Sequence, residues 1–394
     1  EQLDQDVADI YNLMIFDDVT YKVIQKDGMN VLKITTTPSW DVNGQIKFAI
    51  GFEDNFDGHS DYSVKLEYIK FGLNSYAGEW RSRFTFGQEN LLMTELYQPI
   101  DPYGYLYVRP AAFYRNKKVY VSPSILINHT IETDLDETFT MQAKEYGGIL
   151  GVGVNVTKEL HLEVGGVVKR VNPSADFLVE DNSSLQYVTL SPQASVYNIY
   201  ADLEYDDLDN AFFPRSGYRA KLLYRYSDQF KGDESTFSQY LIDVAGAYTF
   251  GRHTFSPRLK AGSTFDTENF SNSQDFTSYF TLGGLFNLSG LPTNAVTGNN
   301  IALGVLVYRY RLSDDGFFGS LTMPLYAGMS VESGSAWYSS DLLLNGTDSF
   351  STDRLLYSGS AYIAADTILG PFYLGVGTTE FDYYSFYFSL GQSF

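Results

Sequence analysis

Apolar and polar residues alternate along the chain from residue 45 to its end, a period expected of β-strands with two different faces. The first run has its apolar face on Ile46, Phe48, Ile50 and Phe52. Sixteen such runs occur, near residues 45–53, 61–71, 78–88, 90–98, 104–121, 137–156, 159–172, 193–206, 217–228, 235–250, 252–265, 299–313, 319–333, 355–367, 370–378 and 383–394. The pattern predicts an all-β protein of sixteen antiparallel strands.

The length and the polar faces of these runs favour a membrane barrel over a soluble sandwich. Many runs are longer than the strands of soluble sheets, which have about five or six residues. Tyrosines gather near the ends of the apolar faces, as in the aromatic girdles of outer-membrane barrels. The polar faces carry charges that a dry core does not accommodate: Asp202, Glu204, Arg219, Lys221, Arg225, Arg309 and Arg311. We therefore expect residues 41–394 to form a sixteen-stranded transmembrane β-barrel whose lumen contains these charges.

Residues 1–40 follow a different pattern. Apolar residues at helical spacing occur within 2–14, at Leu3, Val7, Ile10, Tyr11 and Met14. Two short strands follow, joined at Asp27-Gly28, which is a hairpin signal. We expect a small α+β unit, too short to hold a core of its own, in front of the barrel.

Composition narrows the classes of function. The net charge of −21 argues against nucleic-acid binding, which depends on neutralising phosphates. The absence of cysteine excludes disulfides and thiolate metal sites. The four histidines have no metal-ligand spacing, and no Gly-x-Ser-x-Gly motif occurs. We expect neither a catalytic set nor a bound metal or cofactor in this chain.

Two further segments are distinctive. A long irregular stretch lies between the eleventh and twelfth runs and contains Leu282, Gly283, Gly284, Leu288, Ser289, Gly290 and Leu291. The last run alternates aromatic and small residues, with its apolar face on Tyr384, Phe386, Phe388, Leu390 and Phe394. We expect this strand to close the barrel by pairing with the strand at 45–53, because closure removes an exposed edge.

Several segments together resemble the superfamily of BamA and the two-partner-secretion barrels, which joins POTRA modules to a bacterial surface antigen barrel. The turn at 206–217 (DDLDNAFFPRSG) is similar to a periplasmic turn of that family. The family's sixth extracellular loop enters the lumen, with Leu-Gly-Gly before a Val/Ile-Arg-Gly-Phe/Tyr motif, and residues 282–284 and 288–291 stand in the matching place. Residues 1–40 resemble the C-terminal part of a POTRA domain, and the last strand resembles the signal read by the barrel assembly machinery.

The resemblance implies that this loop contacts a strand of the barrel inside the lumen. The sequence departs from the family pattern at one position of that contact. The family places an acidic residue in an x-x-Asp-x-Gly pattern to meet the loop's arginine, and Glu332 and Gly334 stand there. Ser289 occupies the position of the arginine. We therefore expect at most a neutral hydrogen bond from Ser289, and another partner for Glu332, Arg309 or Arg311. The alternative is that Glu332 is one of many charges in the lumen.

The departure at Ser289 favours one branch, the autotransporters in which a patatin-like phospholipase precedes a POTRA and a barrel. The implied function is to anchor or translocate that fused passenger, absent from this chain, at the bacterial outer membrane, with residues 1–40 in the periplasm. Implied partners are outer-membrane lipid, the barrel assembly machinery and the passenger, and a homodimer stays open. The alternatives are a passive porin-like channel and a two-partner-secretion or assembly transporter.

Overall fold

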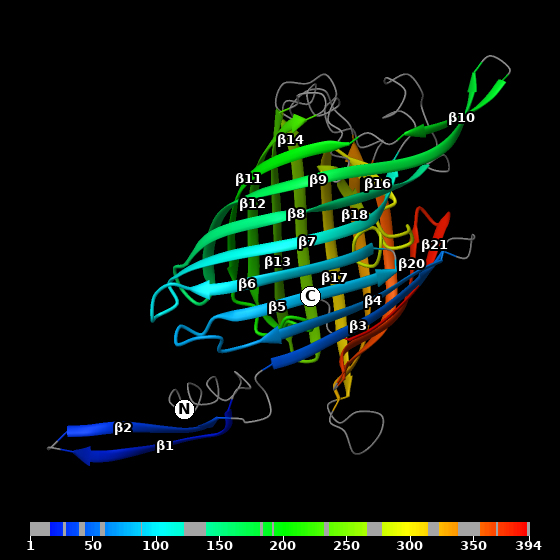
Figure 1. Cartoon of the computed structure of the whole chain (residues 1–394). Helices are drawn as coiled ribbons and strands as arrows, with labels where there is room; N and C mark the ends of the chain where they lie inside the picture. Colours follow the sequence, from blue (N-terminus) through cyan, green and yellow to red (C-terminus); the bar gives the residue numbers. More distant parts are fainter. Residues whose placement is uncertain are drawn as a thin grey trace.

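The computed structural model describes residues 16–26, 29–38, 44–55, 60–87, 89–121, 139–181, 184–190, 193–231, 236–265, 278–313, 323–337, 355–367 and 369–391. Sixteen strands form one closed antiparallel barrel (Figure 1), which confirms the predicted architecture. In the first half these are β3 (Gly44–Asp54), β4 (Ser60–Lys70), β5 (Glu79–Gly87), β6 (Glu89–Pro99), β7 (Leu106–Val121), β8 (Phe139–Asn155), β9 (Leu160–Asp181) and β11 (Ala194–Asp206). In the second half they are β12 (Ser216–Lys231), β13 (Thr236–Phe250), β14 (His253–Phe265), β17 (Asn300–Ser313), β18 (Leu325–Trp337), β19 (Leu356–Thr367), β20 (Gly370–Thr379) and β21 (Tyr383–Gly391).

The two faces of the strands are arranged as the alternation predicted. Apolar side chains such as Ile46, with 69% of its surface exposed, point outward, where lipid covers them in an outer-membrane barrel. Charged side chains point inward, and Glu67 has only 3% of its surface exposed. No helix long and apolar enough to cross a bilayer is found in the described part of the chain.

Two strands differ most from the prediction. β9 continues past residue 172 and pairs beyond the barrel with β10 (Ser184–Leu190). Pro173 pairs with Ala143 of β8 and with neither β10 nor β11, and such an edge position tolerates proline. β18 was predicted over 319–333, but it begins at Leu325 and continues to Trp337, because the pairing with β17 extends from Gly334 opposite Leu303 to Trp337 opposite Asn300.

The barrel closes where β21 pairs with β3, and we call this pairing the seam. Six residue pairs form it among the described residues, from Phe386 opposite Asp54 to Gly391 opposite Ala49. No other strand pairing of the barrel has fewer pairs within the described residues, and β7 and β8 are joined by sixteen. The predicted closure of the last strand onto the first is therefore confirmed, and the seam is the shortest of the barrel's strand pairings within the described residues.

A separate hairpin precedes the barrel, formed by β1 (Phe16–Lys26) and β2 (Met29–Pro38). Figure 1 places it beyond the end of the barrel where β3 begins. The predicted hairpin is confirmed, while the predicted helix over 2–14 lies outside the described residues.

Candidate functional site

Residues 278–299 connect β14 to β17 and fold into the barrel, and we call them the lumen loop. The loop contains a short hairpin of β15 (Phe280–Leu282) and β16 (Val296–Gly298). Its apolar side chains Leu282, Leu288 and Leu291 are almost fully buried and pack on a patch of β17 formed by Ile301, Leu303 and Val305. The burial of these six side chains from water holds the loop against one wall of the lumen.

The middle of the lumen loop is a tight turn over residues 283–291. The amide of Gly283 donates to the carbonyl of Asn287 at 2.6 Å, and the amide of Gly284 donates to that of Leu291 at 3.0 Å. Phe286 and Leu288 have φ angles of 60° and 75°, which non-glycine residues adopt only when surrounding contacts hold them. The turn therefore depends on the barrel wall that surrounds it.

Glu332 of β18 supplies much of that support. Its Oε2 accepts hydrogen bonds from the backbone amides of Leu288 at 2.7 Å and Ser289 at 2.8 Å. Its Oε1 accepts from the hydroxyls of Ser289 at 2.6 Å and Ser330 at 2.5 Å. Both Glu332 and Ser289 are buried, with exposed fractions of 1% and 0%. Four donors to one buried carboxylate satisfy its charge without an arginine, since hydrogen bonds to an ionised group are the stronger kind.

The suggested partners of Glu332 on β17 were wrong. Arg309 pairs in register with Gly328 and Arg311 with Tyr326, four and six residues from Glu332 along β18. At the rise of a strand these offsets amount to about 13 and 20 Å, too far for an ion pair. Arg309 instead donates to the carbonyl of Pro214 at 2.6 Å. The expectation overlooked backbone amides, which supply the charge-stabilising donors here.

The lumen loop also contacts both sides of the seam. On β21, Tyr387 accepts a hydrogen bond from the amide of Gly290 at 2.9 Å, and Ser385 donates to the carbonyl of Gly290 at 2.9 Å. On β3, Glu53 accepts a hydrogen bond from the hydroxyl of Thr293 at 2.5 Å. One short segment of the loop thus touches the two strands that close the barrel.

Gly290 is required by this contact. Its φ angle is 109°, and a Cβ would overlap the backbone of Thr378 and Thr379 on β20. Thr379 also donates to the carbonyl of Ser289 at 2.9 Å. The backbone of the loop therefore lies directly on β20, a separation that only glycine permits.

A second segment enters the lumen from the opposite end. The turn at 207–215 between β11 and β12 places Phe213 inside the barrel, stacked on Tyr326 at 4.9 Å and on Tyr373 at 5.4 Å between ring centroids. The Arg309 guanidinium lies 5.3 Å from the Phe213 ring centroid. Phe286 of the lumen loop reaches the same group, 6.1 Å from Tyr373. The turn and the loop therefore meet at one aromatic cluster.

Sequence reasoning missed several of these residues. Tyr387 and Thr379 lie on the small, polar face of their strands, and nothing in the alternation separates them from other lumen residues. Phe213 had a signal, because two adjacent phenylalanines are unusual in a turn made of aspartate, asparagine, proline and glycine. The outward residues of the last strand, Tyr384, Phe386, Phe388 and Leu390, are partly or largely exposed, and Phe394 lies outside the described residues.

The predicted lumen charges are brought together only in part. Lys221 contacts Asp202 at 2.8 Å and Glu204 at 3.0 Å. Arg225 donates to Gln239 and to the carbonyl of Ser278 at the base of the lumen loop. Of the other predicted arginines, Arg219 lies opposite Asp206, Arg309 lies at the aromatic cluster, and Arg311 lies opposite Tyr326.

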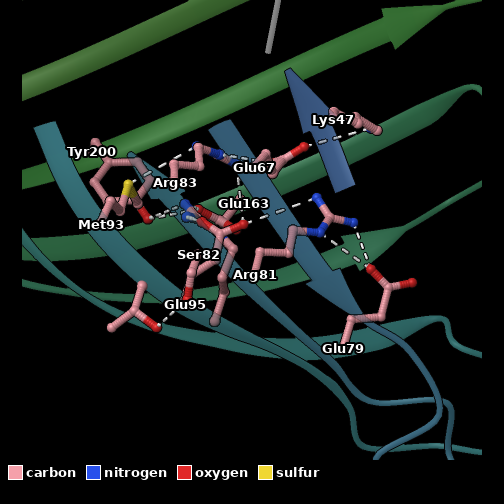
Figure 2. Close-up of polar contacts among 12 residues, drawn as sticks. Lys47, Glu67, Glu79, Arg81, Ser82, Arg83, Met93, Glu95, Glu163 and Tyr200 are labelled. Carbon is pink, nitrogen blue, oxygen red and sulfur yellow. Dashed lines mark hydrogen bonds and ion pairs between the residues drawn. The ribbon is translucent and has the colours of Figure 1, made fainter. Parts of the chain in front are cut away.

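The densest charges lie on the wall made by β3–β9 and β11. We call the following residues the charged belt: Lys47, Glu67, Arg83, Glu95, Arg109 and Glu163 (Figure 2). Glu67 accepts from Arg83 at 2.9 Å and contacts Lys47 at 3.5 Å. Glu95 lies between two arginines, 3.2 Å from Arg83 and 3.2 Å from Arg109. Each of these carboxylates therefore joins bases from two different strands.

The charged belt passes from β7 to β9 across β8, where two glycines lie opposite each other. Arg109 of β7 donates two hydrogen bonds to Glu163 of β9, at 2.5 and 2.9 Å, and Tyr200 of β11 donates to the same carboxylate at 2.6 Å. Gly151 of β8 pairs with Arg109 and with Gly165. A Cβ on Gly151 would lie 2.7 Å from the Glu163 carboxyl carbon, and one on Gly165 would lie 2.5 Å from the Tyr200 hydroxyl. The missing side chains give Arg109 its path across β8.

Metal chemistry has no support in the described part of the chain, where no group of three or more histidine, aspartate or glutamate side chains is placed to hold a metal ion. The arrangement is suited to holding a loop and a wall in place. A closed barrel with a lipid-facing apolar surface, a charged lumen and an inserted loop defines a bacterial outer-membrane barrel.

The family follows from comparison with known proteins. The model of the Omp85 superfamily domain matches residues 101–394, and the chain belongs to this superfamily. BamA from Haemophilus ducreyi lacking POTRA domains 1–3 has a similar structure, with a TM-score of 0.67 at 11% identity, over 99% of this chain and 78% of that one. CdiB from Acinetobacter baumannii has a TM-score of 0.59 at 9% identity, over 98% and 67%. CdiB from Escherichia coli has a TM-score of 0.58 at 11% identity, over 96% and 67%.

No curated protein matches the chain by sequence. At these identities the solved structures establish the fold, and the family match establishes the superfamily. The resemblance inferred from the turn, the loop and the last strand is thus confirmed at the level of the superfamily.

Proposed function

We propose that this barrel moves protein across or into the outer membrane, and that the seam between β3 and β21 opens when it does so. The observation that carries the proposal is the contact of the lumen loop with both seam strands, at Tyr387 and Ser385 on one side and Glu53 on the other. The seam itself has six residue pairs among the described residues. A short pairing held from inside by a separate loop is suited to a barrel that opens under control.

The seam can be tested by locking it. Because the chain has no cysteine, Leu390→Cys with Ile50→Cys creates one disulfide-competent pair at directly opposed, lipid-facing positions of β21 and β3. The matched control joins the same Leu390→Cys to Phe372→Cys, its opposite on β20. The measurement is protease accessibility, at the surface of intact cells, of the proposed passenger upstream of residues 1–40 in the full-length protein, which we call the preceding segment.

The oxidised seam pair is expected to abolish surface exposure, reduction to restore it, and the control pair to leave it unchanged. Equal exposure with the seam locked and unlocked contradicts the proposed function. A passive porin-like channel gives that outcome together with steady ion conductance through the locked barrel, so bilayer conductance of the same two proteins identifies the alternative.

A narrower proposal concerns the passenger. We infer that the barrel belongs to a fused autotransporter whose upstream part is a patatin-like phospholipase. Support comes from the contact of Ser289 with Glu332, which satisfies the carboxylate without the arginine that other branches keep. The full-length reading frame tests this: an upstream Gly-x-Ser-x-Gly motif and phospholipid hydrolysis, lost when that serine becomes alanine, support it. Several POTRA repeats in its place point to an assembly or two-partner-secretion transporter.

We also propose that β1 and β2 are the end of a periplasmic POTRA module. One face of this hairpin is apolar, with Tyr21 opposite Ile34 and Val23 opposite Leu32. Val23 and Leu32 have 61% and 42% of their surfaces exposed. A two-stranded sheet with an open apolar face is stable only when another element covers it, as a helix does in an α+β module.

A further inference from the structure

Charge is distributed unevenly around the barrel. The strands β3–β9 carry the charged belt and a second row in which Arg115 contacts Glu89 at 2.7 Å and Glu145 at 2.9 Å, while Lys169 contacts Glu145 at 3.2 Å. The strands β18–β21 contain two charged residues in total, Glu332 and Asp366. We call β3–β9 with β11 the braced wall, and β18–β21 the neutral wall.

The braced wall resists the separation of its strands. Glu67, Glu95 and Glu163 have between 3% and 5% of their surfaces exposed, so water does not replace the lost partner of a carboxylate. Each of these carboxylates bonds groups from two other strands. Parting any two adjacent strands between β3 and β11 therefore breaks at least one ion pair or hydrogen bond to a buried carboxylate, a change that costs more than the loss of a neutral hydrogen bond.

The neutral wall lacks this bracing. Its lumen side is joined by hydroxyl pairs, Ser330 with Ser360 at 2.6 Å and Ser358 with Thr379 at 2.7 Å. The lumen loop is bound to the same wall through Glu332, Thr379, Ser385 and Tyr387. Of the hydrogen bonds of the loop described above, the one from Thr293 to Glu53 reaches β3.

We propose that the barrel opens as two bodies: the braced wall stays intact, and the neutral wall moves away from it with the lumen loop attached. The inference rests on the proposed function, because it describes how the proposed seam parts. The bonds that then break include the six seam pairs and the contact between Thr293 and Glu53, and β16 of the loop leaves its place beside β7. The contacts of the loop with β18, β20 and β21 persist.

Crosslinks placed in different parts of the full-length protein test this, with surface exposure of the preceding segment as the measurement. Leu66→Cys with Phe84→Cys joins opposed lipid-facing positions of β4 and β5 inside the braced wall. Thr293→Cys with Glu53→Cys, joined by a short reversible thiol reagent, ties the loop to β3. We expect the first crosslink to leave exposure unchanged and the second to abolish it as the seam disulfide does.

The outcomes separate the two proposals. A seam disulfide without effect overturns the proposed function. If the seam disulfide blocks exposure and the β4–β5 crosslink blocks it equally, the braced wall does not stay intact and the inference is wrong. If the tie between Thr293 and Glu53 has no effect while the seam disulfide blocks, the loop does not travel with the neutral wall, and the inference is again wrong.

A second measurement needs no transport. Glu95→Gln removes the charge between Arg83 and Arg109, whereas Asp243→Asn, the control, lies outside the braced wall and removes the pair in which Arg258 of β14 donates to Asp243 of β13 at 2.6 and 2.9 Å. We expect hydrogen exchange in the folded barrel to quicken on the order of tenfold in β5 and β7 for Glu95→Gln. For the control it should quicken only in β13 and β14. Faster exchange confined to β6 in Glu95→Gln would refute a continuous brace.

Discussion

Ser289 shows how one position can change its chemistry while the contact around it is kept. Its hydroxyl and amide both bond Glu332, and a second hydrogen bond runs from the amide of Phe286 to its hydroxyl at 2.9 Å. A Cβ on Gly377 of β20 would lie 2.7 Å from that of Ser289, so the loop lies directly against a strand position that glycine occupies. Ser289 is fully buried, and a longer side chain there must displace its neighbours.

Two substitutions test this pair. Glu332→Gln keeps one oxygen that accepts from the amides of Leu288 and Ser289 but turns an NH2 donor toward the hydroxyls of Ser289 and Ser330 and removes the charge, so we expect the folded barrel to lose about 1–3 kcal/mol. Ser289→Arg, although it matches the family motif, should destabilise the barrel further, because the larger side chain enters a fully buried site and removes the hydroxyl that bonds Glu332 and the amide of Phe286. Denaturant unfolding followed by gel mobility of unheated samples measures both, and a Ser289→Arg protein as stable as wild type would contradict the tight fit.

Gly290 makes a sharper residue-level prediction. Gly290→Asp forces a side chain into the backbone of β20 and a charge into a buried site, so little folded, heat-modifiable barrel should form. Gly246→Ala is the control, because a Cβ there meets its nearest neighbour at an ordinary 3.6 Å. A Gly290→Asp protein that folds and exports like the control would show that the loop does not need its contact with β20.

At the scale of single elements, the strands were predictable and the inserted segments were not. The alternation located all sixteen barrel strands because lipid on one side and water on the other impose a period of two on every one of them. The predicted ends of β18, before Gly334, and of β9, before Pro173, were wrong. Each strand continues because it still pairs with a neighbouring strand there. The insertion of Phe213 depends on contacts with three distant strands, which no local pattern records.

The prediction for a single element concerns the stability contributed by the turn at 207–215. Phe213 has 3% of its surface exposed and is packed against two tyrosines and Arg309. Phe213→Ala should lower the stability of the folded barrel by about 3–5 kcal/mol. Phe381→Ala serves as control, because Phe381 has 80% of its surface exposed in a turn. Equal unfolding midpoints for the two proteins would show that the turn contributes nothing to the core.

For the molecule as a whole, the sequence was sufficient for the class of fold and for the place where it closes. Only part of the candidate site could be predicted from the sequence: Ser289 and Glu332 were found through the family motif. Glu53, Thr293 and Tyr387 were not found, because 240 residues separate Glu53 from Thr293 and their meeting follows from closure.

The span of the contact between Thr293 and Glu53 also sets an order of events in folding. Most of the charged belt joins strands within a few tens of residues, and its longest link, from Arg109 to Glu163, spans 54. Such local pairs form early, whereas contacts between distant segments come late because closing a long stretch of chain costs more entropy. The contact of the lumen loop with β3 forms only after β21 has met β3, whereas its contacts with Glu332 span 43 and 44 residues and can form earlier. The contact with β3 is therefore the last step, and protection of the backbone around Thr293 marks the moment when the barrel is closed.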